Sequence, residues 1–192
     1  MTADRPEGRL DDVRPFSVPV VLVDPDPGWP QLFELDRADI TAALGASALS
    51  VEHVGSTSVA GLPAKPVIDI LLLVADSADE DCYVPPLVAI GYTLRVREPG
   101  WLEHRVLYRR VVDGDPHNVN LHVLSPGLGD VEIARMRMFR DWLRAHPEDR
   151  DLYAATKREL ATRRWRFVQD YADAKTDVVQ AILAKAGAPP VP

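Results

Sequence analysis

Residues 51–74, VEHVGSTSVAGLPAKPVIDILLLV, contain the pattern on which the prediction of the fold depends. The stretch 49–54 suits one strand, and the apolar run 66–74 predicts a second strand, buried on both faces. Between them lie a turn of sequence GSTS and a loop that carries Lys65. A Gly-Ser turn directly after a strand brings backbone N–H groups and hydroxyls together, and this combination binds phosphate oxygens.

The second predicted strand contains one charged residue, Asp69, in an otherwise aliphatic run. Side chains alternate along a strand, so Asp69, Leu71 and Leu73 share one face and the residues between them share the other. Burying an acid in such a strand costs free energy unless it is paired, hydrogen-bonded or bound to metal. Asp69 therefore predicts a functional site, with a structural cap or an ion pair with Lys65 or an arginine as the alternative.

The composition bounds the class of protein. The chain has 192 residues and a net charge of −7, which argues against a protein that coats nucleic acid but allows an anionic substrate in a locally basic cleft. The single cysteine, Cys82, excludes an internal disulfide and a cysteine-based zinc site. No apolar run reaches the length of about 18 residues that a membrane span requires, and the N-terminus has no apolar signal segment. We therefore expect a cytoplasmic protein with no membrane partner.

The rest of the chain predicts further strands and helices around this stretch. Its hydrophobic periodicity and turn signals divide it into elements. We expect a disordered lead-in at 1–16 and a frayed tail at 187–192. Strands are expected at 17–24, 92–96, 104–112 and 117–124, the last two as a hairpin. Helices are expected at 29–44, 76–90, 130–145, 148–165 and 167–186, and Pro85-Pro86 either interrupts or begins the helix of 76–90. The predicted fold is α/β (α+β): a mixed sheet over 17–128, flanked by helices, with C-terminal helices over 129–186 that close over the open face of the sheet.

Three parts of the sequence together resemble one known family. They are GSTSVAGLPAKPVIDI at 55–70, HNVNLHV at 117–123, and FRDWLRAHPEDRDLYAATKRELA at 139–161, which includes Tyr153 and Lys157. These closely resemble the GrpB-like family of the nucleotidyltransferase superfamily. The resemblance covers about residues 18–182, and its motifs form a long, specific string.

The resemblance implies metal-dependent transfer of a nucleotidyl group from an NTP to an unknown small-molecule or protein acceptor. The implied phosphate-binding residues are Gly55, Ser56, Thr57, Ser58 and Lys65. Asp69 is then the catalytic residue and the ligand of a Mg²⁺ or Mn²⁺ ion, which neutralises charge as a hydroxyl attacks the α-phosphate.

The sequence departs from the superfamily's catalytic pattern of two carboxylates two positions apart. The second position is Leu71, which cannot bind a metal ion, and no third carboxylate lies on the strand 117–124. On that strand, Asn118, Asn120 and His122 are the candidates for substrate contacts or for a weaker metal site. Glu52 can take the place of a missing metal-binding carboxylate only if its side chain faces the cleft.

Other candidates have a structural alternative. His53 precedes the turn and is equally consistent with a ligand contact and with a hydrogen-bonded structural role. His117 and His122 lie five positions apart on one predicted strand, so they face opposite sides and cannot share a metal ion. Arg140 lies on one helix face with Arg137 and Arg144, where it either reaches into the cleft toward phosphate or forms surface ion pairs.

Three hypotheses follow for the function. The first is a metal-dependent nucleotidyltransferase, indicated by the Gly-Ser turn and Asp69. The second is a catalytically inactive nucleotide-binding or regulatory module, indicated by Leu71 and the missing third carboxylate. The third is an interaction domain without nucleotide, which requires a cleft around Ser56 that side chains close. The sequence predicts neither the acceptor nor the oligomeric state.

Overall fold

A six-stranded mixed sheet forms the centre of the protein. The structure is a computed structural model that describes residues 8–9, 20–110, 117–165 and 167–190. The strands, in the spatial order β1-β4-β5-β6-β3-β2, pair antiparallel except for the parallel pair β3 and β6. Their bounds are β1 Gly8–Arg9, β2 Ser50–Val54, β3 Val67–Leu73, β4 Thr93–Glu98, β5 His104–Arg109 and β6 Asn118–Leu124. The predicted fold class is confirmed, and β5 and β6 form the expected hairpin.

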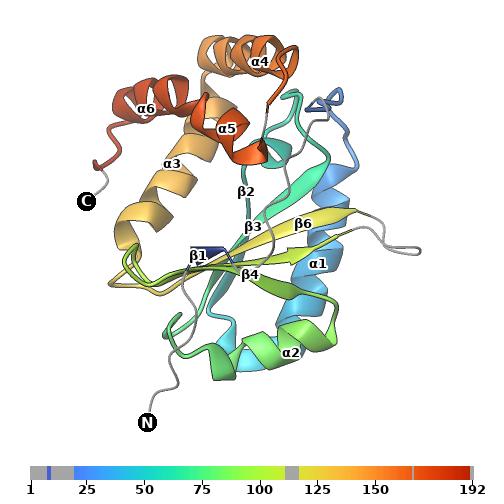
Figure 1. Ribbon diagram of the computed structural model, residues 1–192, viewed down its shortest axis with the longest axis vertical. Helices are drawn as coiled ribbons and strands as arrows, with labels where there is room; N and C mark the ends of the chain where they lie inside the picture. Colours follow the sequence, from blue (N-terminus) through green and yellow to red (C-terminus); the bar gives the residue numbers. More distant parts are fainter. Residues whose placement is uncertain (1–7, 10–19, 111–116, 166, 191–192) are drawn as a thin grey trace.

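Two helices cover one face of the sheet (Figure 1). They are α1 Trp29–Leu44 and α2 Val84–Ala89, with a short 3₁₀ turn at Glu80–Cys82 before α2. Ile68, Ile70 and Leu72 of β3 pack into the cluster beneath α1 and α2. Of the two alternatives for 76–90, the structure has the helix that the proline pair begins: α2 starts at Val84, and the prolines occupy its first turn.

Four helices lie on the other face (Figure 1). They are α3 Asp130–Ala145, α4 Pro147–Ala161, α5 Val168–Asp173 and α6 Thr176–Lys185. Leu71 and Leu73 pack on this side with Ile133 of α3, so the predicted alternation along β3 is confirmed. The single helix expected over 167–186 is two helices, and the break between them contains Lys175.

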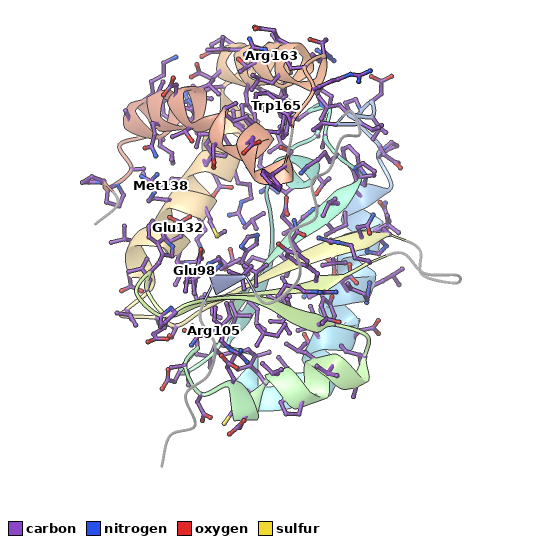
Figure 2. All side chains as sticks on the ribbon, viewed as in Figure 1. Glu98, Arg105, Glu132, Met138, Arg163 and Trp165 are labelled. Atoms are coloured by element: carbon purple, nitrogen blue, oxygen red, sulfur yellow. The ribbon has the colours of Figure 1, made fainter. Side chains whose placement is uncertain are left out.

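Buried charges on the α1 and α2 side are paired. Asp36 of α1 is 1% exposed and contacts Arg109 of β5 and His117, which precedes β6. Glu80 accepts hydrogen bonds from Arg97 and Arg105 at distances of 2.8 and 2.7 Å. Figure 2 shows Arg105 on the α2 side of the sheet, away from Glu132 and Met138 of α3.

The terminal segments differ in part from the expectations. Gly8–Arg9, inside the lead-in expected to be disordered, pair with β4, and the rest of 1–16 lies outside the described residues. No named strand covers 20–24; Val23 forms only an isolated bridge with Ala64, because the turn-forming sequence from Asp24 follows at once. In the tail, the carbonyl of Pro189 accepts a hydrogen bond from Arg135.

None of the helices in the described residues is long and apolar enough to cross a membrane.

Candidate phosphate-binding site

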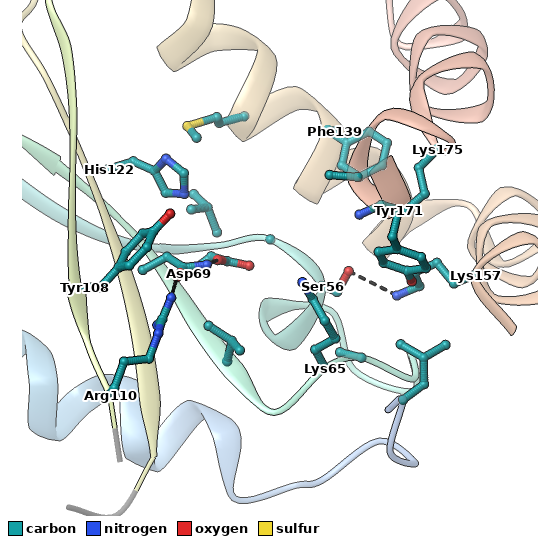
Figure 3. A pocket seen from close by; sticks show the side chains of 18 residues that line it. Ser56, Lys65, Asp69, Tyr108, Arg110, His122, Phe139, Lys157, Tyr171 and Lys175 are labelled. Atoms are coloured by element: carbon teal, nitrogen blue, oxygen red, sulfur yellow. Dashed lines mark hydrogen bonds between the residues drawn. The ribbon is translucent and has the colours of Figure 1, made fainter. Parts of the chain in front are cut away.

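A pocket of about 620 Å³ lies between the sheet and the helices of the C-terminal half. Its floor comes from the ends of β2, β3, β5 and β6, and its roof from α3, α4 and the region of α5 and α6 (Figure 3). The polar residues that line it are Ser56, Lys65, Asp69, Tyr108, Arg110, Asn120, His122, Lys157, Tyr171 and Lys175. The pocket therefore joins the predicted Gly-Ser turn to residues far along the chain.

Gly55 sets the geometry of the turn. Its φ is +67°, a conformation in which a side chain is strained, and a Cβ there would lie 2.3 Å from Oδ2 of Asp69. The backbone at Gly55 thus passes directly against the carboxylate. Ser56 begins the 3₁₀ turn Ser56–Ser58, which directs its side chain into the pocket.

Positive charge predominates among the described residues that line the pocket. Lys65, Arg110, Lys157 and Lys175 come from four separate segments, and Asp69 is the one carboxylate among these described lining residues. The ring of Tyr171 lies near two of the lysines: Nζ of Lys65 is 5.7 Å and Nζ of Lys175 is 4.9 Å from its centroid. This arrangement favours an anionic ligand.

The surroundings of the lysines lower their pKa values. Burial lowers the pKa of Lys157 to about 7 and, together with the nearby Lys65, lowers that of Lys175 to about 8. Burial also lowers the pKa of Lys65. A bound phosphate would oppose these shifts, because it replaces lost solvation with an opposite charge.

Lys157 makes the closest contact with the turn. Its Nζ lies 3.0 Å from Oγ of Ser56 and also donates a hydrogen bond to the carbonyl of Pro63. The side chain is almost fully buried, 2% exposed, and lies over the ring of Tyr153 at 4.7 Å. The amino group of Lys157 is thus held beside the serine hydroxyl.

The surroundings of Asp69 do not fit a Mg²⁺ or Mn²⁺ site. Asn120, directly opposite Asp69 on β6, donates its amide N–H to Oδ1 at 2.7 Å, so the strand that lacks the third carboxylate presents a donor to Asp69. Burial raises the pKa of Asp69, although Asn120 and Lys65 act against this. Within the described residues no three His, Cys, Asp or Glu side chains gather as potential ligands.

His122 faces the pocket as part of a chain of hydrogen bonds. Its Nδ1 lies 3.1 Å from Nε2 of His104, and Nδ1 of His104 lies 2.7 Å from Oε2 of Glu98. Burial and the neighbouring His104 lower the pKa of His122 to about 3, so it is neutral. His117 contacts Asp36 on the opposite side of the sheet, as the alternation predicted.

Several predicted residues lie outside the pocket lining. The hydroxyl of Thr57 contacts His53 at 3.0 Å and donates to the carbonyl of Val67, whereas that of Ser58 donates to the carbonyl of Gly55 at 2.6 Å. The ring of His53 stacks on Phe33, which supports its structural alternative. Asn118 lies opposite Val67 at the start of β6.

Glu52 and Arg140 face each other away from the pocket. Arg140 donates to Glu52 at 3.3 Å, to the carbonyl of His53 at 3.2 Å and to Asp141 at 2.7 Å. Arg137 also pairs with Glu52. The structure thus places Arg140 in ion pairs that hold α3 against β2, and neither residue lines the cleft as a phosphate or metal ligand.

Sequence reasoning missed the helical part of the site. In the sequence, Lys157 stands out only through the family resemblance. It lies four positions after Tyr153 on the buried face of α4, and a lysine on such a face is a detectable signal. Lys175, Arg110, Tyr108 and Tyr171 carry no comparable signal, because tertiary packing alone brings them to the pocket.

An α+β protein with a cation-lined pocket is the class that this fold and site define. The sequence matches the family described as "GrpB protein" over residues 19–185. The chain therefore belongs to the GrpB family.

Individual relatives agree with this assignment. The chain is 53% identical to UPF0157 protein BH1888 of Halalkalibacterium halodurans, over 95% of this chain and 90% of that protein. The crystal structure of the conserved protein GrpB from Enterococcus faecalis superposes with a TM-score of 0.75 at 28% identity, over 86% of this chain and 96% of that one. A protein named dephospho-CoA kinase, from Mycolicibacterium paratuberculosis, is 36% identical over 76% of this chain but only 40% of its own length.

Proposed function

We propose that this protein binds a nucleoside triphosphate through its phosphates, and that binding needs no divalent metal. The observation that carries the proposal is the convergence of Ser56, Lys65, Lys157 and Lys175 on one pocket beside Asp69. In this arrangement the lysines supply the charge neutralisation that a metal ion supplies elsewhere. Of the three functions expected from the sequence, the second also has nucleotide binding without metal-dependent transfer.

The pocket has room for such a ligand. Its volume of about 620 Å³ is within the usual range for small-molecule sites, and Tyr108 and Phe139 supply apolar walls for a base. An open pocket at Ser56 also argues against an interaction domain without nucleotide. The relative named dephospho-CoA kinase also supports a phosphate-bearing ligand. This support has little weight, because the matched segment is a minor part of that protein.

Calorimetry with the four common NTPs tests the proposal. We expect binding of at least one NTP to persist in EDTA. Lys175→Gln should weaken it about tenfold or more, because a charge-assisted phosphate contact is lost. Lys185→Gln is the matched control, since Lys185 pairs with Asp149 outside the pocket lining and should leave the affinity unchanged. Absence of binding by every NTP, with and without Mg²⁺, would contradict the proposal.

Metal-dependent nucleotidyl transfer is the second candidate, supported by family membership and by Asp69. Asn120→Asp separates it from the first. This change places a second carboxylate opposite Asp69, so we expect it to weaken binding in EDTA and to create a dependence on Mg²⁺. If the unaltered protein already requires Mg²⁺ or Mn²⁺ for binding, and transfers label from an NTP to an acceptor, the second candidate replaces the first.

A further inference from the structure

Ser56 and Lys157 form a pair that phosphate binding alone does not require. Figure 3 shows the contact between Oγ of Ser56 and Nζ of Lys157, which measures 3.0 Å. The serine lies on a tight turn after a strand, with a hydroxyl that lines the pocket. The lysine reaches it from α4 and is nearly inaccessible to solvent. A serine beside a buried lysine is a known arrangement for nucleophilic catalysis.

The contacts of Lys157 fit a neutral amine that accepts a proton. Nζ of Lys157 donates to the carbonyl of Pro63 and to Oγ of Ser56. A neutral amine has two N–H groups and one lone pair, so once Lys157 has lost its proton the same contact with Ser56 can run from the hydroxyl to the lone pair. The charged groups that act on Lys157 are Lys175, Arg158 and Asp69. The first two favour the neutral amine and Asp69 opposes it, while burial, the largest influence, brings the pKa to about 7. A base with a pKa near the working pH is suited to proton transfer.

We propose that Ser56 is a nucleophile with Lys157 as its general base, and that Ser56 takes the nucleotidyl group of a bound nucleoside triphosphate. The identity of this substrate rests on the proposed function. Oγ of Ser56 forms a bond to the α-phosphorus, and the bond from that phosphorus to the oxygen of the pyrophosphate breaks. The hydroxyl proton passes to Nζ of Lys157 and pyrophosphate leaves, so the product is a phosphodiester on Ser56. Lys65 and Lys175 lie where they neutralise the phosphate charge.

A fluorophosphonate probe tests the nucleophile without any nucleotide. Oγ of an activated serine bonds to the probe's phosphorus and fluoride leaves, so intact mass and peptide mapping report modification of Ser56. We expect the labelling rate to be low near pH 6 and to rise through about pH 7, because Lys157 must lose its proton. Absence of labelling at Ser56, or labelling that does not change with pH, would overturn the proposal.

Lys157→Arg tests the base. Arginine keeps the positive charge and can donate hydrogen bonds, but it does not give up its proton in a protein. We expect labelling of Ser56 to fall by about a hundredfold, the lower range for loss of a general base. Lys185→Arg, outside the pocket lining, is the matched control and should label as the unaltered protein does. Lys157→Met replaces the arginine variant if that variant does not fold. The pH profile of labelling in the unaltered protein tests the base without either variant. Equal labelling in a folded Lys157 variant would overturn the role of the lysine.

Protection by pyrophosphate separates this proposal from the proposed function. If both hold, pyrophosphate blocks the labelling of Ser56, and incubation with an α-labelled NTP leaves label on Ser56 that Ser56→Ala removes. Labelling that pyrophosphate does not block would support the serine and lysine pair and contradict the phosphate pocket. NTP binding without probe labelling would support the pocket and overturn the pair.

Discussion

The two faces of the sheet both contain buried charges, but they arrange them differently. Under α1 and α2, Asp36 contacts Arg109 and His117, and Glu80 accepts from two arginines, so each buried carboxylate meets its cations directly. Under α3 to α6, the described pocket residues include four cations and one carboxylate, which is bonded to an amide. The ion pairs of the first face join elements, as the pair of Arg140 with Glu52 does on the second face, whereas the pocket of the second face gathers positive charge around a space for a ligand.

Removing a buried ion pair on the α1 and α2 side of the sheet should have the largest effect on stability. We expect Asp36→Asn to lower the free energy of unfolding by about 3–5 kcal/mol, because it leaves the buried Arg109 without its carboxylate. Urea unfolding measures the loss. The control is Glu34→Gln on the same helix, where an exposed pair with Arg37 is worth less than about 1 kcal/mol. NTP affinity per folded molecule should not change, and a specific loss of affinity would contradict the separation of the two faces.

At the pocket, Gly55→Ala should remove ligand binding. The new Cβ would overlap Oδ2 of Asp69 and would be strained by the positive φ, so the turn and the carboxylate must move apart. We expect a loss of stability of about 2 kcal/mol or more and a loss of measurable NTP binding. Gly61→Ala has a similar φ of +79° but no neighbour within 4 Å, so it should lose stability alone. Calorimetry on both folded variants tests this difference, and retained binding in Gly55→Ala would contradict the assigned geometry.

The proposed phosphate site should depend on pH. Lys157 and Lys175 have pKa values of about 7 and about 8, so both lose positive charge as the pH rises from about 7 to about 9. An anion binds the protonated forms, and we therefore expect NTP affinity to fall about tenfold or more over this range. Calorimetry should also show proton uptake on binding. Lys175→Gln should flatten the alkaline part of the profile, and an affinity that rises with pH would contradict the role of the lysines.

Arg140 should give the smallest effect. Its guanidinium bonds Glu52, Asp141 and a backbone carbonyl outside the pocket lining, so Arg140→Ala should change NTP affinity less than about threefold. Thermal unfolding should show a loss of at most about 1 kcal/mol from the weakened contact between α3 and β2. A large loss of affinity in a folded variant would return Arg140 to the phosphate site that the sequence indicated.

The sequence predicted those features of the two faces of the sheet that depend on local sequence pattern. Alternation along β3 correctly placed Asp69 on one face and Ile70 on the other, and the turn chemistry placed Ser56 beside Asp69. Helical periodicity put Arg140 on a common face with two other arginines, but it could not show that this face meets Glu52. That choice depends on how α3 crosses β2, which is a property of tertiary packing.

Local sequence patterns could not predict the helical half of the pocket. Lys175 lies in a break between α5 and α6 that no proline or glycine marks, so the sequence favoured one continuous helix there. Lys157 was detectable only as a lysine on the apolar face of α4. Its contact with Ser56 joins positions 101 residues apart, and hydrophobic periodicity cannot predict a contact between residues so distant in the sequence.

The order of the four cations along the chain has a consequence for biosynthesis. Lys65 and Arg110 emerge from the ribosome well before Lys157 of α4 and Lys175, which lies between α5 and α6. On the proposed function, a nascent or truncated chain that ends before α4 holds only half of the charge that the ligand meets. The nucleotide would therefore stabilise finished molecules and leave incomplete ones to proteolysis.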